Sequence, residues 1–361
     1  MLAGSRNRVF VIAEAGVNHN GDPERALNMV EAAARAGADA VKFQTFRAEL
    51  LASPEAPKAP YQARTTDAGE TQIEMLRRLE LDERAHRRLA SAAKDAGIEF
   101  MSTPFDLNSL ELLLAIGIRR IKIASGDITN GPLLLRAARS GLPTILSTGM
   151  ALLGEVRDAL GVLAWGYRRQ ADPPSLAALR DDYARDSGGT TFAEKVMLLQ
   201  CASAYPAPPQ AINLRAMDTL ANTFRLAVGL SDHSVGIAIA IAAAGRGAAV
   251  IEKHFTLDRT LPGPDHAASI EPDELAAMIR AIREVERAMG NGRKEPAEAE
   301  QPNIRAARRG LIAARDIAAG TPITVDMFVV VRPATGISPI RIWDFLGKPA
   351  ARTYRMGEPI D

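Results

Sequence analysis

The sequence predicts an α/β fold, a TIM-type (β/α)8 barrel that is followed by a small β-rich domain. Eight short apolar runs alternate with Ala- and Leu-rich segments of helical periodicity between Val9 and Met289. Strands that alternate with helices form a parallel sheet, and eight such units in a segment of this length are typical of a TIM barrel. After Gly290 the helical periodicity stops, and short strand-like pieces punctuated by Gly and Pro replace it.

The predicted strands are short runs rich in β-branched and other apolar residues. They span Val9–Ala13, Ala40–Phe43, Ile98–Ser102, Arg120–Ala124, Thr144–Ser147, Val196–Cys201, Leu226–Leu230 and Ala249–His254. An open, doubly wound sheet is the competing arrangement, but no G-x-G-x-x-G motif follows the first strand. The closed barrel is therefore the better prediction.

The predicted helices lie between these strands. They span Pro23–Ala36, Glu83–Ala96, Leu107–Ile116, Gly131–Arg139, Leu152–Leu163, Gly236–Gly245 and Pro272–Met289. Gly37 and Gly97 end two of them just before the next strand, as glycine caps do. Residues 166–191 are polar, and we expect them to form a loop insertion.

Three segments make up the predicted domain organisation. Residues 1–290 form the barrel domain, and residues 291–309, which are charged and contain Pro296 and Pro302, form a linker. Residues 310–361 form the β-rich domain, with strand-like pieces at Gly310–Ala314 and Met327–Val331. A domain of this size builds little core, so docking or oligomerisation would stabilise it.

The composition excludes several classes of protein. The 361 residues carry 44 basic and 43 acidic side chains, a formal net charge of +1, so we expect neither nucleic acid nor an anionic membrane as a partner. A single cysteine, Cys201, excludes an internal disulfide and fits a reducing compartment. No apolar run is long enough for a membrane span, and no signal peptide is evident, so a cytoplasmic location is predicted.

Polar side chains gather where the predicted strands end. In a TIM barrel the C-terminal ends of the strands share one rim, where catalytic residues lie. The residues at these ends are Glu14, Lys42, Gln44, Thr103, Lys122, Ser125, Asp127, Ser147, Ser203, Tyr205, Ser231, His233 and His254. Every one of the eight ends carries a group that can bind a ligand or transfer a proton, which predicts an active site at this rim.

Two of these residues, Lys42 and Lys122, lie inside apolar strands. Burying an ammonium group without a partner is costly, so both lysines indicate an anionic ligand. Together with the hydroxyl groups nearby they can hold a phosphate and a carboxylate. Alternatively, one lysine forms a Schiff base, as in covalent aldolases.

The histidines divide into candidate ligands and structural residues. His233 and His254 end neighbouring strands, which makes them a plausible pair of metal ligands beside the carboxylates Glu14 and Asp127. His86 lies on a predicted helix among charged residues, and we expect it at the surface. Cys201 is interpreted as a small buried side chain rather than a ligand.

Eight stretches in order along the chain resemble the bacterial sialic acid synthases. They are AEAGVNHNGD (13–22), GADAVKFQTF (37–46), STPFD (102–106), IKIASGDITNGPLL (121–134), LSTGMA (146–151), YPAPP (205–209), VGLSDHSVGIAIAIAAAGRGAAVIEKHFTLD (228–258) and PGPDHAAS (262–269). The similarity covers about nine-tenths of the chain, and the C-terminal part resembles the antifreeze-like (SAF) domain that ends those enzymes.

The resemblance implies a reaction and a set of roles. Phosphoenolpyruvate would condense with an N-acetylated amino sugar, first of all N-acetylmannosamine, and water to give a sialic acid-type nonulosonate and phosphate. A divalent metal, Mn²⁺ or else Mg²⁺, would be bound by His233 and His254 in a domain-swapped homodimer. Phosphoenolpyruvate would be held by Lys42, Thr103, Lys122, Ser125, Ser147, Ser203 and Ser231. The sugar would face Glu14, Gln44, Tyr205 and Asp265, with Arg332 of the partner subunit on its N-acyl group. Glu14 and Asp127 are the carboxylates available for proton transfer.

Alternatives remain open at this point. An N,N'-diacetyllegionaminate or pseudaminate synthase would differ only in the sugar accepted, and the PGPDHAAS segment is closer to the sialate and legionaminate branches. Asp127 stands where many members of the family carry glutamate, which leaves the identity of the sugar open. A Schiff-base aldolase is a second class. A non-enzymatic binding protein is a third, but such a protein needs neither the two histidines nor the buried lysines.

Overall fold

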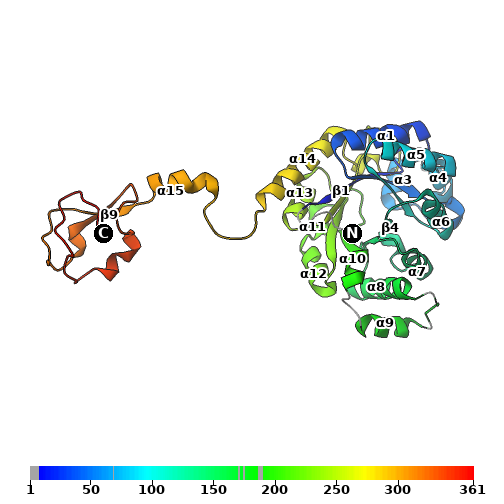
Figure 1. Ribbon diagram of the computed structural model, residues 1–361. Helices are drawn as coiled ribbons and strands as arrows, with labels where there is room; N and C mark the ends of the chain where they lie inside the picture. Colours follow the sequence, from blue (N-terminus) through cyan, green and yellow to red (C-terminus); the bar gives the residue numbers. More distant parts are fainter. Residues whose placement is uncertain (1–7, 68, 170, 174, 186–189) are drawn as a thin grey trace. The chain divides into compact units, whose positions relative to one another are not determined.

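The computed structural model describes residues 8–361, apart from residues 68, 170, 174 and 186–189. The chain divides into two compact units, residues 1–290 and residues 291–361 (Figure 1). Each unit is described separately below. Within the described residues, no helix is both long and apolar enough to cross a lipid bilayer.

The first unit is a nearly closed barrel of parallel strands surrounded by helices, as the sequence predicts (Figure 1). Its strands are β1 (Phe10–Gly16), β2 (Ala40–Thr45), β3 (Glu99–Pro104), β4 (Ile121–Ile123), β5 (Thr144–Ser147), β6 (Val196–Cys201), β7 (Ala227–Asp232) and β8 (Val250–His254). In the described chain they form one eight-stranded sheet in the order β3-β2-β1-β8-β7-β6-β5-β4. The two outermost strands of this order, β3 and β4, lie next to each other, which closes the ring.

Strand periodicity sorts the side chains into two sets, because successive residues point to opposite faces. One set fills the barrel interior with a buried apolar cluster that includes Ile12, Met101, Met197 and Val250. The other set, which includes Val11, Phe43 and Leu198, packs under the helices as part of the main core. Two residues beyond the interior cluster the inward positions become polar, and this change marks the floor of a pocket.

Helices surround the sheet and are capped by side chains that the sequence supplies. The main helices after the strands are α1 (Pro23–Ala36), α5 (Glu83–Asp95), α6 (Leu107–Ile116), α7 (Gly131–Arg139), α8 (Leu153–Arg168), α12 (Arg215–Phe224), α13 (Ala238–Gly245) and α14 (Pro272–Ala288). Asp22, Asp82 and Asp106 accept hydrogen bonds from backbone N–H groups in the first turns of α1, α5 and α6. Each such cap is typically worth about 1 kcal/mol of stability.

In the part of the chain that the structure describes, three connections contain helices that the sequence analysis did not predict, namely those after β2 and β5 and the one after β6, which contains α11 (Pro209–Ile212) and α12. After β2 come α2 (Ala48–Leu51), α3 (Pro60–Thr65) and α4 (Gln72–Leu79), of which α2 and α4 pack around a separate apolar cluster with Phe46 and Met75. The polar segment 166–191 was expected to be a loop. Where it is described, it instead contains α9 (Leu176–Arg185) and the start of α10 (Thr190–Lys195). Leu179 and Tyr183 of α9 are buried beside α8, so two apolar side chains turn this polar segment into a packed helix.

The second unit is small and β-rich. Its strands β9 (Gly310–Ala313) and β10 (Phe328–Val331) are antiparallel, and its core is formed mainly by Leu311, Ile317 and Tyr354. The short turns η4 (Val325–Met327) and η5 (Pro339–Asp344) complete it. The segment predicted as a linker contains η3 (Glu298–Glu300) and the helix α15 (Gln301–Ala307), so it is partly ordered by local structure.

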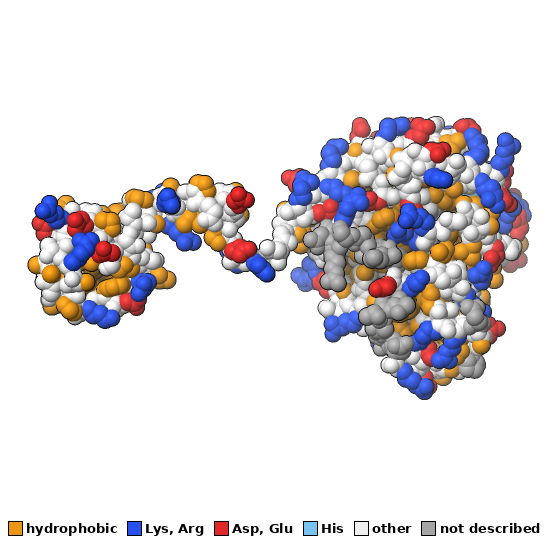
Figure 2. Space-filling model, in the orientation of Figure 1, with side chains coloured by type: hydrophobic (Ala, Val, Ile, Leu, Met, Phe, Trp, Pro, Cys, Tyr) orange, Lys and Arg blue, Asp and Glu red, His pale blue; other side chains and the backbone are white. Residues whose placement is uncertain are grey.

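The charge pattern agrees with the near-zero net charge. On the face of the first unit that Figure 2 shows, basic and acidic side chains are interspersed rather than gathered into a patch of one sign. In the described part of the first unit, basic and acidic side chains also form pairs, as in Arg136–Glu111 and Arg180–Asp158. Nothing on this face is typical of a nucleic-acid-binding surface.

Candidate active site

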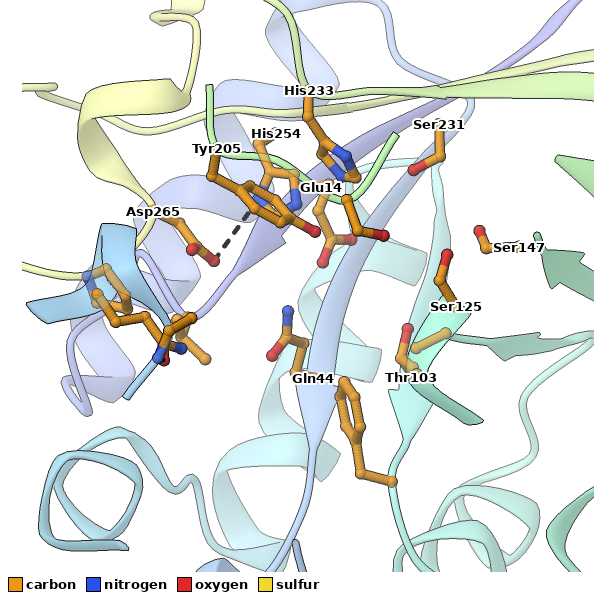
Figure 3. A pocket seen from close by; sticks show the side chains of 18 of the residues that line it. Glu14, Gln44, Thr103, Ser125, Ser147, Tyr205, Ser231, His233, His254 and Asp265 are labelled. Atoms are coloured by element: carbon orange, nitrogen blue, oxygen red, sulfur yellow. Dashed lines mark hydrogen bonds and ion pairs between the residues drawn. The ribbon is translucent and has the colours of Figure 1, made fainter. Parts of the chain in front are cut away.

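A pocket of about 400 Å³ opens at the C-terminal ends of the barrel strands. Its lining includes most of the residues that the sequence singled out: Glu14, Lys42, Gln44, Thr103, Lys122, Ser125, Ser147, Ser203, Tyr205, Ser231, His233, His254 and Asp265. In Figure 3, the hydroxyl side chains Thr103, Ser125 and Ser147 lie on one side of the pocket, and Tyr205, His254 and Asp265 lie on the other. The pocket therefore has two chemically different sides.

The floor is a buried network of two lysines and two glutamates. Lys42 Nζ lies 2.5 Å from Glu14 Oε2 and 3.7 Å from Glu252 Oε2. Lys122 Nζ lies 3.2 Å from Glu252 Oε1, which also accepts a hydrogen bond of 2.8 Å from Ser231 Oγ. All four charged side chains are almost fully buried. With both lysines and both glutamates charged, the network is neutral overall.

The two carboxyl groups of this network differ in their affinity for protons. Burial raises the pKa of Glu14 to about 7, and the nearby Glu252 adds to this rise, although Lys42 opposes it. Burial also tends to raise the pKa of Glu252, but Lys122 and Lys42 outweigh it and lower that pKa to about 2. Of the two groups, Glu14 is therefore the one that can exchange a proton near neutral pH.

Hydroxyl groups on the neighbouring strands extend this floor. Lys42 Nζ donates to Thr103 Oγ1 at 2.9 Å, and the Gly149 N–H donates to Ser125 Oγ at 3.0 Å. Ser147 Oγ is buried without a hydrogen-bond partner in the described structure, as expected of a donor that waits for a ligand. A Cβ at Gly149 would lie 2.5 Å from Ser203 Oγ and 2.8 Å from Ser125 Oγ, so a larger residue there would displace these two hydroxyl groups.

His233 and His254 meet above this floor, with their ring centroids 5.2 Å apart. His233 Nδ1 donates to the Ala202 carbonyl at 2.9 Å, which leaves Nε2 free to bind a ligand. His254 Nδ1 is buried without a hydrogen-bond partner and lies 3.8 Å from Asp265 Oδ2, the contact drawn as a dashed line in Figure 3.

This pair fits a metal that takes few protein ligands. Burial lowers the pKa of His254 well below its usual value, which keeps the ring neutral, as a metal ligand must be. Burial also acts to lower the pKa of His233, but the Cys201 thiol and the Ala202 carbonyl outweigh it and raise that pKa, so a metal would compete with a proton there. Among the described residues no group of three or more His, Cys, Asp or Glu side chains is arranged to hold a metal ion. The remaining coordination positions would be left to substrate or water.

The wall beside the histidines is aromatic and apolar. The Tyr205 ring stacks on Tyr61 of α3, with centroids 4.7 Å apart, and lies 4.2 Å from the His233 ring. Further wall residues come from the connection after β2: Leu51, Ala59, Gln62, Gln72, Met75, Leu76 and Leu79. This part of the pocket combines apolar surface with side-chain amides and therefore suits groups such as an acetamido substituent.

Two predicted site residues are not brought to the pocket. Asp127 lies in the short turn η1 (Ser125–Asp127), where its Oδ1 accepts a hydrogen bond from Asn130, and it is not among the lining residues. Its side chain points to the start of α7, because Asn130 is the cap of that helix. Arg332 is exposed, follows β10 in the second unit and is not among the residues that line the pocket of the first unit, so its role across subunits stays a prediction.

The sequence analysis missed Glu252 and misplaced His86. Glu252 lies two residues before His254 in β8, so strand periodicity alone would have placed both side chains on the inward face. His86 is fully buried rather than at the surface. Its Nε2 hydrogen-bonds Thr45 Oγ1 at 2.8 Å, and its Nδ1 lies 2.9 Å from the Asp82 carbonyl. The charged residues next to His86 in the sequence indicated an exposed helix face, but the side chain of His86 points to the barrel.

Comparisons with known proteins agree with this geometry. The NeuB family model matches residues 29–294, and the SAF domain model matches residues 308–361. The chain is 46% identical to an N,N'-diacetyllegionaminic acid synthase of Campylobacter jejuni, over 98% of this chain and 99% of that protein. It is 44% identical to an N,N'-diacetyllegionaminic acid synthase of Legionella pneumophila, over 98% and 94%. The crystal structure of an N-acetylneuraminic acid (sialic acid) synthetase from Leptospira borgpetersenii superposes with a TM-score of 0.67 at 34% identity, covering 84% of this chain and 92% of that one.

Proposed function

This chain belongs to the NeuB family of phosphoenolpyruvate-dependent nonulosonate synthases, and we propose that its product is N,N'-diacetyllegionaminic acid. The observation that carries the proposal is the similarity along nearly the whole chain to two synthases of that product, at 46% and 44% identity. The sialic acid synthetase, whose product the sequence analysis favoured, is 34% identical. A sugar substrate that leads to this product carries two acetamido groups. The pocket wall, which combines apolar surface with side-chain amides, suits the second of them.

The floor of the pocket is proposed to hold phosphoenolpyruvate. Lys42 and Lys122 supply positive charge, and Thr103, Ser125, Ser147 and Ser231 supply hydroxyl groups for the phosphate and the carboxylate. The floor is neutral when empty, so an incoming anion has to be balanced by a proton or a cation. Glu14, whose pKa is about 7, is the carboxyl that can take up such a proton.

The proposed reaction joins C3 of phosphoenolpyruvate to the aldehyde carbon of the sugar. Water captures the positive charge that develops at C2 and loses one proton, while the aldehyde oxygen gains one; the C2 hydroxyl so formed then loses its proton as the C2–O bond to phosphate breaks, which leaves a ketone and inorganic phosphate. A divalent metal ion, Mn²⁺ by preference, would be held by His233 and His254 and, when bound, would polarise the aldehyde as a Lewis acid. Of the carboxyl groups that line the pocket, Glu14 and Asp265 are suited to the proton transfers, because burial raises their pKa values to about 7 and about 6, whereas the pKa of Glu252 is lowered to about 2.

A covalent aldolase is the weaker alternative. Burial acts to lower the pKa of Lys42, but Glu14 and Glu252 outweigh it and raise that pKa, so this amine stays protonated and is a poor nucleophile, whereas burial lowers the pKa of Lys122, which makes Lys122 the better candidate for a Schiff base. Treatment with borohydride in the presence of pyruvate tests this alternative directly. A stable adduct on Lys42 or Lys122 would favour the aldolase, and no adduct is expected.

We also propose a domain-swapped homodimer. Met150, which lines the pocket, is exposed, as are Leu50 and Leu152 in the connections after β2 and β5, and the second unit exposes Ile340 and Trp343. Exposed apolar surface of this kind marks protein–protein contacts. In the proposed dimer the second unit of one chain covers the pocket of the other and brings Arg332 to the N-acyl group of the sugar.

The function is tested by measuring phosphate release from phosphoenolpyruvate with a panel of hexosamines. The panel contains N-acetylmannosamine and diacetamido hexoses of different configuration. We expect kcat/KM to be highest with the diacetamido hexose that gives N,N'-diacetyllegionaminic acid. A preference for N-acetylmannosamine would overturn the proposed product and leave the family reaction intact.

A further inference from the structure

Directly behind the histidine pair lies a buried ion pair that does not touch the pocket. Lys253 Nζ lies 2.8 Å from Asp232 Oδ2, and the two side chains are 1% and 0% exposed. Asp232 immediately precedes His233, and Lys253 immediately precedes His254. Because neighbouring residues of a strand point to opposite faces, this pair lies on the outer side of the sheet while the histidines face inward.

The ion pair holds both strands and the turn that follows β7. Asp232 and Lys253 are register partners in the β7–β8 ladder. Lys253 Nζ also donates to the Ser234 carbonyl at 2.7 Å, and Asp232 Oδ1 accepts from Ser234 N at 2.9 Å and from Ser234 Oγ at 2.6 Å. The residues before and after His233, Asp232 and Ser234, each contact Lys253. The backbone on both sides of His233 is therefore fixed to β8 by this lysine.

Stability alone is a poor reason for this arrangement. The free energy that two buried charges gain by attracting each other is largely offset by the cost of removing them from water. Apolar residues of similar size often stabilise a protein equally well. Apolar residues cannot form hydrogen bonds of fixed length and direction between β8 and the turn that follows β7. Groups of this kind, one step removed from a metal, orient its ligands.

We propose that Asp232 and Lys253 are positioning residues that set the separation and orientation of His233 and His254 for metal binding. The inference rests on the proposed function, because that function assigns the metal to the two histidines. A purely structural ion pair would instead stabilise the barrel without any specific effect on the metal.

The chain offers a matched control at the opposite end of the barrel. Arg120 and Glu99 form a largely buried ion pair with contacts of 2.8 and 2.9 Å, and Glu99 begins β3 while Arg120 directly precedes β4. Like Asp232 and Lys253, they join neighbouring barrel segments, but they lie at the strand ends away from the pocket. Lys253→Met and Arg120→Met therefore remove comparable charges at different ends of the same barrel.

The experiment measures Mn²⁺ binding to the full-length chain by electron paramagnetic resonance of free Mn²⁺, together with Tm by calorimetry. We expect Lys253→Met to weaken Mn²⁺ binding by roughly tenfold to a hundredfold, the range typical of groups that orient metal ligands. Arg120→Met should lower Tm but leave the Kd for Mn²⁺ unchanged. Should Lys253→Met fail to fold, the double variant D232N/K253M, which leaves no unpaired charge, is expected to show the same weakened binding.

The outcomes separate this inference from the function beneath it. Equal Mn²⁺ affinity in the wild type and Lys253→Met, or an equal loss in Lys253→Met and Arg120→Met, would overturn the positioning role and leave the metal assignment standing. A wild-type protein that binds no Mn²⁺, but still releases phosphate in the presence of chelator, would overturn both.

Discussion

Lys42 and Glu14 face each other on neighbouring barrel strands, and their charged atoms lie 2.5 Å apart at the floor of the pocket. This contact changes the meaning of the buried lysine. The sequence predicts that the charge of Lys42 is balanced by an anionic ligand, whereas in the structure it is already balanced by Glu14. Binding of phosphoenolpyruvate must therefore rearrange charge as well as fill space, and several of the following predictions depend on this.

Replacing either floor lysine should weaken the use of phosphoenolpyruvate. A charge-assisted contact to a buried anion is worth about 1.5–3 kcal/mol, so Lys42→Met and Lys122→Met should raise the KM for phosphoenolpyruvate on the order of tenfold to a hundredfold. The KM for the sugar should change much less. Lys94→Met, on the exposed end of α5, is the control and should behave as the wild type. An unchanged KM for phosphoenolpyruvate in both floor variants would contradict the anion site.

The Glu252→Gln variant should bind phosphoenolpyruvate more tightly. The change removes a negative charge beside the proposed anion site and keeps an oxygen that can accept the hydrogen bond from Ser231. Two unit charges 4 Å apart interact by about 4 kcal/mol at the effective dielectric of a protein surface, so a roughly tenfold tightening is a modest share of that term. Isothermal titration with phosphoenolpyruvate measures it. Weaker binding would mean that Glu252 is needed mainly to hold the two lysines in place.

Removing either histidine of the pair should abolish the metal-dependent activity. We expect chelator to stop phosphate release by the wild type and Mn²⁺ to restore it, whereas His233→Ala and His254→Ala should stay inactive at any Mn²⁺ concentration tested. His86→Gln is the matched control, because His86 is also fully buried but hydrogen-bonds Thr45 outside the pocket. Full activity of His254→Ala would refute the metal assignment.

The buried neutral histidines should destabilise the fold on mild acidification, whereas the raised pKa values of Glu14 and Asp265 act in the opposite direction, so the contribution of one histidine is measured by comparing variants. Burial lowers the pKa of His19 from 6.5 to about 3, and burial also lowers the pKa of His86. Below pH 6.5 the unfolded chain binds protons that the folded chain does not. The stabilisation is therefore complete above pH 6.5 and is lost progressively as the pH falls toward the folded pKa, by up to about 1.4 kcal/mol per pH unit for each histidine. Tm between pH 7.5 and 5 should fall less steeply in His86→Gln, and an identical slope would show that another group dominates.

Mixed dimers test whether Arg332 acts across subunits. A His254→Ala chain is co-expressed with an Arg332→Ala chain, and the mixed dimer is purified with two different tags. If Arg332 completes the pocket of the partner, one site carries both defects and the other carries none, so about half of the wild-type dimer activity should return. If Arg332 serves its own chain, each site keeps one defect and activity stays at the level of the single variants.

The barrel was predictable because a short apolar strand pattern recurs eight times along the chain, in alternation with helical segments. The predicted strand Thr144–Ser147 and the predicted helix Pro23–Ala36 match β5 and α1 at both ends. The helices α3 and α9 were not predicted, because α9 buries only Leu179 and Tyr183 and α3 buries no side chain, which leaves too little periodicity to detect. A helix that packs by one edge cannot be distinguished from a loop by composition.

The pocket was predictable to the extent that strand ends share one rim. Thirteen of the proposed residues line it, since parallel strands place their ends together irrespective of side-chain detail. Asp127 was assigned from its position after a strand, yet η1 turns it toward Asn130. Glu252 was overlooked because it lies within a strand, where apolar residues are expected. Its pairing with lysines on two other strands is a tertiary relationship that no local pattern contains.

The apolar layer beneath the pocket has a consequence for the order in which molecules come and go. Ile12, Met101, Met197 and Val250 seal the barrel below the charged floor, so the mouth is the route for both substrates and both products. Glu252 lies two residues below His254 on the same strand face, and Lys42 two residues below Gln44, a step of roughly 6–7 Å. An anion on the lysines therefore sits deeper than a sugar at the histidines. With the substrates bound as proposed, a single opening predicts that phosphoenolpyruvate binds first and phosphate leaves last, an ordered kinetic scheme in which phosphate competes with phosphoenolpyruvate.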